Sequence, residues 1–425
     1  AAPPVGAAGA ALGALRGRSL RDALLVAQVA ALARAGRGQT VLDVLDAALL
    51  DAARAGRAGT VGRLASSLLR SAGAWPWPTY GDDPGPLLER LRSLEPFVER
   101  DPAAHARLLA ATAIGRCYDP DPTVPERLSA RALAIADALG DEDAIADALL
   151  GRLLTYSGVA AHADEIIVLA DRLIGLSHRE ARVDAAIARA VASMAHLSLG
   201  DVAAATEAVR LAVAETDVLQ LPVIRVQLRW MEGTLATWRG DFDEANRHYD
   251  IGTRVHLQTE LYYAGSAALA RLSLRRERDD LATADPAGTF EWEPWDAAIA
   301  AARHDAVTAE QRLTSWLDEQ NAWIWITLGH VTLLADTAVE AGLVDVAPRL
   351  LALLDPYAGR IAVVGHIGVI NTVDYARGRL LALMGETDRA REILEGTLAF
   401  ARATGGAPTV ARCERALAEL DAAPR

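Results

Sequence analysis

The chain has 425 residues, of which 52% are hydrophobic and 23% charged, a composition typical of folded globular proteins and long enough for several domains or one repeat array. Its 43 basic and 56 acidic residues give a net charge of −13, and every basic residue is arginine. Because a Walker A loop and a Schiff-base site both need lysine, these ATPase and enzyme classes are excluded. The net acidity argues against direct nucleic-acid binding.

Membrane and secretory signals are missing from the sequence. No segment reaches the roughly 18 apolar residues of a membrane span, and residues 1–15 lack the basic start of a signal peptide. The two cysteines, Cys117 and Cys413, support neither a disulfide framework nor a C-x-x-C metal site. The sequence therefore predicts a cytoplasmic protein that contacts no membrane. Since Ala1 opens the chain, either an initiator methionine has been removed or the chain is cut from a longer protein.

Helical periodicity begins in residues 19–35, where Leu20, Leu24 and Val29 share one face, and it continues through almost the whole chain. Glycines predict the ends of the helices, at Gly36, Gly38, Gly56, Gly73, Gly140, Gly200, Gly240, Gly342 and Gly385. No alternating run is long enough to require a sheet. We expect an all-α chain of about twenty helices.

Two Pro-, Gly- and Trp-rich segments interrupt the helices, around residues 71–86 and 275–295. They divide the chain into a flexible N-terminal segment (1–17), N-terminal helical repeats (18–72), a Pro/Trp-rich corner (73–86), central repeats (87–274), a loop (275–295) and C-terminal repeats (296–425).

An internal repeat is visible at the Gly-Asp turns, because Gly200 and Gly240 lie forty residues apart. Around the second turn, Gly233 and Ala245 are small where two helices would touch. Looser copies surround Gly342 and Gly385, and in a degenerate copy His304 holds the glycine position. The pattern resembles tetratricopeptide repeats, which implies a right-handed α-solenoid of helical hairpins without a sheet.

Three segments extend the resemblance to one family: AWPWPTYG (74–81), PERLSARALAIADALGDEDAIADALLGRLL (125–154) and the stretch that begins LLDPYAGRIAVVGHIGVINTVDYARGRL (from 353). They resemble the C-terminal repeat region of large actinobacterial transcriptional regulators. In that family a LuxR-type, SARP-type or cyclase module and a P-loop ATPase precede tetratricopeptide-like repeats. The family's glycine-rich patch is only partly kept here, as Gly365 and Gly368. The resemblance implies a regulatory or ligand-sensing piece, without the ATPase.

Candidate catalytic groups have simpler explanations. The nine histidines show no metal-ligand spacing, and Cys117 has no adjacent base. The acids Asp141, Glu142 and Asp143 begin a helix, where they suit its dipole. GHIGVIN lacks the G-x-G-x-x-G pattern and a preceding strand. We therefore expect no catalytic residue, metal or cofactor.

Aromatic usage suggests a binding face, because nine tryptophans stand against four phenylalanines. In the register set by Gly240, first-helix residues that would line the inner groove are Trp230, Thr234, Thr237, Trp238, Met194, Tyr375 and Arg379. The alternative, that Trp230 and Trp238 fill space between repeats, stays open.

Two functions follow from these patterns. The first is a non-catalytic regulatory or sensor domain of a transcriptional regulator, whose concave groove recognises a protein or peptide partner or a small hydrophobic effector. The alternative is a stand-alone helical-repeat protein that binds or sequesters a hydrophobic small molecule. Self-association stays open under both.

Overall fold

Helices dominate the computed structural model, which describes residues 5–70, 85–259, 265–284, 293–319 and 323–422. The N-terminal helices are α1 (Val5–Arg34), α2 (Gly38–Arg54), α3 (Ala58–Ser66), the 3-10 turn η1 (Ser67–Arg70), α4 (Gly85–Val98), α5 (Pro102–Gly115), α6 (Thr123–Leu139), α7 (Glu142–Thr155) and α8 (Ala163–Ile174). The central helices are α9 (Ala181–Ser198), α10 (Val202–Leu219), α11 (Pro222–Arg239), α12 (Phe242–His256) and α13 (Ser266–Glu277). The C-terminal elements are α14 (Glu293–Ala302), α15 (Ala306–Asp318), α16 (Thr327–Glu340), α17 (Ala347–Leu354), β1 (Ile361–Val364), β2 (Gly368–Thr372), α18 (Val373–Leu383), α19 (Thr387–Thr404) and α20 (Ala407–Ala422). The predicted all-α class is confirmed for these residues.

The turns between paired helices follow the predicted glycine pattern. Gly200 and Gly240 have φ of +83° and +79°, the left-handed region that glycine enters without steric penalty. His304 takes the same conformation, with φ of +62°, in the copy where it replaces glycine. The acid after the glycine caps the next helix, since the Asp201 carboxylate accepts a 2.9 Å hydrogen bond from the Ala204 N–H.

The helices form two layers. Helices α3, α5, α7, α9 and α11 contact one another in succession, while α4, α6, α8 and α10 each pack against members of this first layer. Small residues set the crossings: a Cβ added at Gly151 would lie 2.6 Å from Ala110 Cβ, and one at Gly233 would lie 2.6 Å from Tyr249 Cε1. Close approach therefore requires glycine at these two positions.

A buried β-hairpin contradicts the expectation of a solenoid without a sheet. Strands β1 and β2 pair antiparallel, with Val363 opposite Val369, and every residue of both strands is buried. Gly365 turns the chain with φ of +52°, and Asn371, with φ of +59°, lies where the register shifts. The β-branched run on both sides of the turn favours strands, because Val and Ile pack well on a pleated surface.

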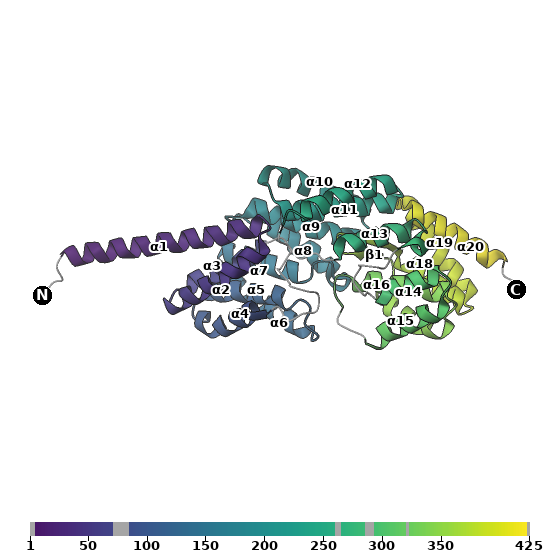
Figure 1. Cartoon of the computed structure of the whole chain (residues 1–425), viewed down its shortest axis with the longest axis horizontal. Coiled ribbons are helices and arrows are strands. Elements are labelled where there is room, and N and C mark those ends of the chain that lie inside the picture. Colours follow the sequence, from purple (N-terminus) through teal and green to yellow (C-terminus); the bar gives the residue numbers. More distant parts are fainter. Residues whose placement is uncertain (1–4, 71–84, 260–264, 285–292, 320–322, 423–425) are drawn as a thin grey trace.

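The C-terminal helices return to the central ones and close a ring around this hairpin. Trp238 Nε1 on α11 donates a 3.1 Å hydrogen bond to the Thr404 carbonyl, and the Trp238 and Phe400 rings lie 6.3 Å apart. Helices α9, α11, α13, α16, α18 and α20 all contact the hairpin. Figure 1 shows β1 enclosed among α13, α16 and α18.

Two predicted boundaries also differ from the structure, and a third lies mostly outside the described residues. The segment 1–17, expected to be flexible, is helical from Val5, because its alanines and leucines favour helix; Figure 1 shows α1 projecting from the body. The loop predicted at 275–295 is shorter, since α13 runs to Glu277 and α14 begins at Glu293. Of the predicted corner at 73–86, residues 73–84 lie outside the described ranges, and α4 starts at Gly85.

Candidate functional site

The residues predicted to line a groove lie inside the molecule. Trp230, Trp238 and Met194 are at most 2% exposed, and Thr234 and Thr237 are fully buried. Tyr375 is 8% exposed, and the Arg379 side chain, at 21%, pairs with Glu419 at 2.6 Å. The expectation of a free face is therefore wrong, and the alternative, that the two tryptophans fill space, describes the structure.

The hairpin explains this burial. Thr234 Oγ1 donates a 2.8 Å hydrogen bond to the carbonyl of His366, at the hairpin turn, so the chain itself covers the predicted groove face of α11. Thr234 and Thr237 also place their hydroxyls 3.4 Å from the Tyr249 hydroxyl. Trp238 instead packs at the contact between α11 and the C-terminal helices, which we call the C-terminal seam. Tyr375 and Arg379 belong to α18. The predicted residues thus do not form one site.

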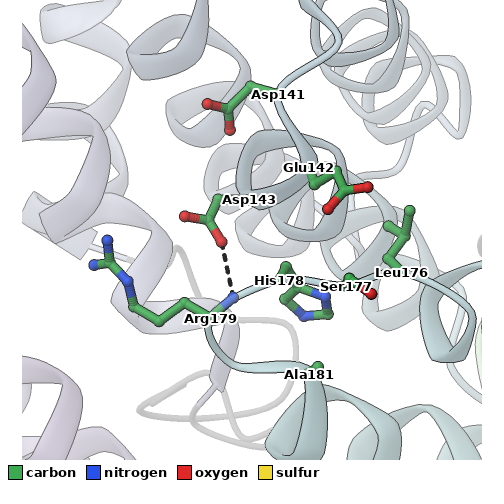
Figure 2. A pocket seen from close by; sticks show the side chains of 8 residues that line it. All are labelled: Asp141, Glu142, Asp143, Leu176, Ser177, His178, Arg179 and Ala181. Atoms are coloured by element: carbon green, nitrogen blue, oxygen red, sulfur yellow. Dashed lines mark hydrogen bonds between the residues drawn. The ribbon is translucent and has the colours of Figure 1, made fainter.

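The structure presents a different candidate, an open pocket of about 680 Å³ between the start of α7 and the loop that leads into α9. Its lining residues are Asp141, Glu142, Asp143, Leu176, Ser177, His178, Arg179 and Ala181. Figure 2 shows the three acids on one side of the loop and the Arg179 side chain directed away from His178. We call this the α7–α9 pocket.

Helix capping places the acids at the mouth of the pocket. The Asp141 carboxylate accepts a 2.7 Å hydrogen bond from the Ala144 N–H and caps α7, as the sequence predicted. The Asp143 carboxylate accepts a 3.0 Å hydrogen bond from the Arg179 N–H and so fixes the loop (Figure 2). Two carboxylates of the rim are thus held by neutral backbone donors. Three acids against the single Arg179 give the rim a net negative charge.

Beneath the pocket lies a buried ionic cluster, which we call the Arg70 site. Arg70, the last residue of η1, donates from Nε and Nη2 to the two oxygens of Asp184, at 2.8 and 2.7 Å. Its Nη1 donates to Asp147 Oδ1 at 2.7 Å. The exposed fractions of the three side chains are 9%, 0% and 6% for Arg70, Asp184 and Asp147. A guanidinium is therefore bound by two carboxylates from two different helices.

Two further cations complete the cluster and connect it to the pocket. His178 Nε2 lies 2.9 Å from Asp184 Oδ2, and Arg107 Nε donates to Asp147 Oδ2 at 2.6 Å. Arg107 also lies 3.8 Å from the carboxylate of Asp141 on the rim. His178 belongs to both places, because it lines the pocket while its side chain is only 1% exposed.

Electrostatics favours the charged forms here. The hydrogen bond to Asp184 raises the pKa of His178 above its ordinary value, against the effect of burial, and the Leu176 carbonyl adds to the increase. His178 Nδ1 nevertheless makes no hydrogen bond of regular geometry. Burial alone would lower the pKa of Arg70, but the adjacent Asp147 and Asp184 carboxylates outweigh it and raise that pKa. The arrangement can bind and orient charged groups.

Sequence reasoning missed this site, although it carries a signal. Asp147 and Asp184 each interrupt an apolar run, in IADALLG and RVDAAIA, on helices that pack on several sides. A buried carboxylate needs a partner, so two such positions predict a cation between them. Nothing local identifies Arg70 as that cation.

The two cysteines are unreactive at neutral pH. Burial raises the pKa of the Cys117 and Cys413 thiols to about 12, which keeps both protonated at neutral pH. Within the described ranges, no group of three or more His, Cys, Asp or Glu side chains is placed to hold a metal ion. Of the helices in those ranges, none combines the length and apolar character needed to cross a bilayer.

No protein-family model matches the chain, and no curated protein matches it.

Proposed function

We propose that the chain is a non-catalytic recognition module, a right-handed solenoid of tetratricopeptide-like hairpins that serves as the regulatory domain of a cytoplasmic transcriptional regulator. The observation that carries this proposal is the recurrence of one helical unit with a left-handed turn residue, as at Gly200, Gly240 and His304. Such arrays present side chains from successive units along a continuous surface. The resemblance in sequence to actinobacterial regulators supplies the regulatory role.

Three ionisable groups around Arg152, namely Glu126, Glu165 and Tyr156, support binding rather than proton transfer. A general acid or base works best when its pKa lies near the operating pH. Glu126 and Glu165 both pair with Arg152, and burial would raise their pKa values. Hydrogen bonds outweigh burial and lower both pKa values: at Glu126 they come from Tyr156 and Arg152, and at Glu165 from Arg152 and His162. Burial raises the pKa of Tyr156, whose hydroxyl donates to Glu126 at 2.7 Å. These shifts move the groups away from neutrality and stabilise ion pairs.

The partner binds at the N-terminal half, at the α7–α9 pocket. The hairpin contacts α9, α11 and α16, which argues against an apolar chamber between these helices for a sequestered hydrophobic molecule. The α7–α9 pocket, in contrast, is open and acidic at its rim. A peptide segment with positive charge complements it, whereas the net charge of −13 repels nucleic acid.

Site-specific photo-crosslinking in the cells that produce the protein tests this function. A benzoylphenylalanine residue replaces Ser177 at the pocket or, as the matched control, Thr206 on the exposed side of α10. We expect a discrete protein adduct from position 177 that is absent from position 206 and is lost in Asp143→Arg. The same adducts from both positions, or none from 177, would contradict the proposal.

A further inference from the structure

We propose that the Arg70 site is a recognition site for an arginine side chain of a partner peptide, and that Arg70 itself occupies it in the resting chain. The inference rests on the proposed function and deepens it, because it names the chemistry of the partner. Four features of the site carry it: its selectivity, the pairing that remains without Arg70, the element that holds Arg70, and the adjoining pocket.

The first feature is a geometry that only arginine satisfies. A guanidinium presents five donors in a planar fork, and here three of its nitrogens meet three carboxylate oxygens at 2.7 to 2.8 Å. Asp184 receives the side-on, two-bond contact and Asp147 the third bond. A lysine ammonium is a point charge and cannot make the two-bond contact and the third bond in this plane. The site therefore discriminates by shape as well as by charge.

The second feature is that both carboxylates keep a cation when Arg70 leaves. Asp184 retains His178 at 2.9 Å, and Asp147 retains Arg107 at 2.6 Å. Removal of one partner from a buried pair is normally very unfavourable because a charge is left alone. Here His178 and Arg107 remain as partners. The exchange of one guanidinium for another therefore leaves no buried carboxylate without a cation.

The third feature is the element that carries Arg70. It ends η1, a four-residue 3-10 turn, whereas Asp147 and Asp184 lie within long α-helices. A 3-10 turn has poorer hydrogen-bond geometry than an α-helix, and all four residues of η1 are buried. The acids thus lie on long helices, and the proposed exchange has to move only the short turn that carries Arg70.

The fourth feature is the α7–α9 pocket, which adjoins the site. Arg107 bridges from Asp147 to the rim residue Asp141, and His178 lies between the pocket and Asp184. The His178 side chain is almost fully buried at this junction. An arginine-bearing segment that lies along the acidic rim approaches the site at His178, whose buried side chain it has to displace.

Calorimetric titration of the purified full chain with a small probe tests the proposal. The probe is N-acetyl-Gly-Arg-Gly-amide, and its lysine counterpart is the comparison. We expect the arginine peptide to bind Arg70→Ala about tenfold more tightly than wild type, because the competing side chain is gone. We also expect it to bind that variant about tenfold more tightly than the lysine peptide does.

Matched variants keep the test specific. Arg152→Ala also removes a guanidinium held by two carboxylates, Glu126 and Glu165, and should gain no affinity. Adding Asp184→Asn to Arg70→Ala should abolish the gain, and Arg70→Gln replaces Arg70→Ala if the alanine variant does not fold. Absence of binding by a folded Arg70 variant, equal binding of the two peptides, or an unaffected Asp184→Asn double variant would each overturn the inference.

Failure of this inference is distinguishable from failure of the proposed function, because the titration needs no cellular partner. A crosslinked partner at position 177 together with no peptide binding removes the arginine site alone. Peptide binding without a crosslinked partner leaves the site in place and contradicts the recognition role in the cell.

Discussion

At the scale of single residues, buried charges mark the places where helices distant in sequence meet. Arg412 on α20 lies 2.6 Å from Glu277 on α13, and each side chain is 3% exposed. Without Arg412, Glu277 keeps only the more distant Arg276, at 3.9 Å. Loss of one member of a buried pair typically reduces stability by about 3 to 5 kcal/mol. Ion pairs of this kind therefore fix which helices pack together.

We predict that Arg412→Ala lowers the free energy of unfolding by about 3 to 5 kcal/mol, whereas Arg210→Ala changes it by less than about 1 kcal/mol. Arg210 pairs with Glu207 on the surface of α10, where water screens the attraction. Urea denaturation of both variants measures the difference. Equal effects would show that the α13–α20 pair contributes no more than a surface pair.

His178 predicts a dependence of stability on pH. Its pKa is raised in the folded chain, chiefly by the hydrogen bond to Asp184, so protonation stabilises the fold. That contribution is complete below the ordinary histidine pKa, about 6.5, and is lost as the pH rises through the higher folded value. Urea midpoints of wild type should therefore fall relative to His178→Asn as the pH rises above about 6.5. A constant difference across this range would contradict the prediction.

The buried tryptophans predict a stability defect. Trp238 fills the seam between α11 and the C-terminal helices, where a Cβ added at Gly406 would lie 2.5 Å from its ring. We expect Trp238→Ala to lower the free energy of unfolding by about 3 to 5 kcal/mol, because it leaves a large cavity. Crosslinking from position 177 should persist in the folded variant. An unchanged thermal midpoint would instead favour an exposed recognition role for Trp238.

At the scale of elements, two glycines allow the cost of a positive φ to be distinguished from the cost of a steric contact. Gly365 in the hairpin turn and Gly385 before α19 both have positive φ, +52° and +81°. A Cβ at Gly365 would lie 2.8 Å from the Trp325 ring, while a Cβ at Gly385 would meet nothing within 4 Å. The two positions thus share the backbone penalty and differ in the contact.

We predict that Gly385→Ala reduces stability by about 1 to 2 kcal/mol and that Gly365→Ala reduces it by a further 1 to 3 kcal/mol or so. Thermal and urea denaturation of the two variants check this ordering. Equal losses would show that Trp325 adapts without cost and that the hairpin turn is loosely seated.

The sequence predicted the helices and their turns well, because both depend on neighbours along the chain. His304 is the clearest case, since it was placed at the glycine position of a repeat and has the positive φ of the glycines there. The hairpin was missed because strands buried on both faces lose the alternation that identifies a strand. Trp238 was misplaced because its hydrogen-bond partner, Thr404, is 166 residues away. No local pattern distinguishes a face covered by solvent from one covered by such a distant helix.

At the scale of the whole molecule, the hairpin joins two hydrophobic cores. Ile361 and Val363 belong to the core shared with the N-terminal and central helices, while Ala362 and Val364 belong to the core of the C-terminal half. Successive strand residues point to opposite faces, which places one face of the sheet in each core. In an open repeat array each unit stabilises only its neighbours, but here one element touches both halves.

This connection predicts that the two halves open together. Val363→Ala removes a contact from the first core only, yet it should speed amide hydrogen exchange in both α9 and α16, because β1 contacts both helices. Leu45→Ala on α2 is the control: it empties a fully buried position of the same core, distant from the hairpin in the array, and should speed exchange in the first helices while α16 stays protected. If Val363→Ala speeded exchange in α9 and left exchange in α16 unchanged, the two halves would open independently and the hairpin would not couple them. Exchange that rises in both helices would show that the hairpin makes the two halves one cooperative unit.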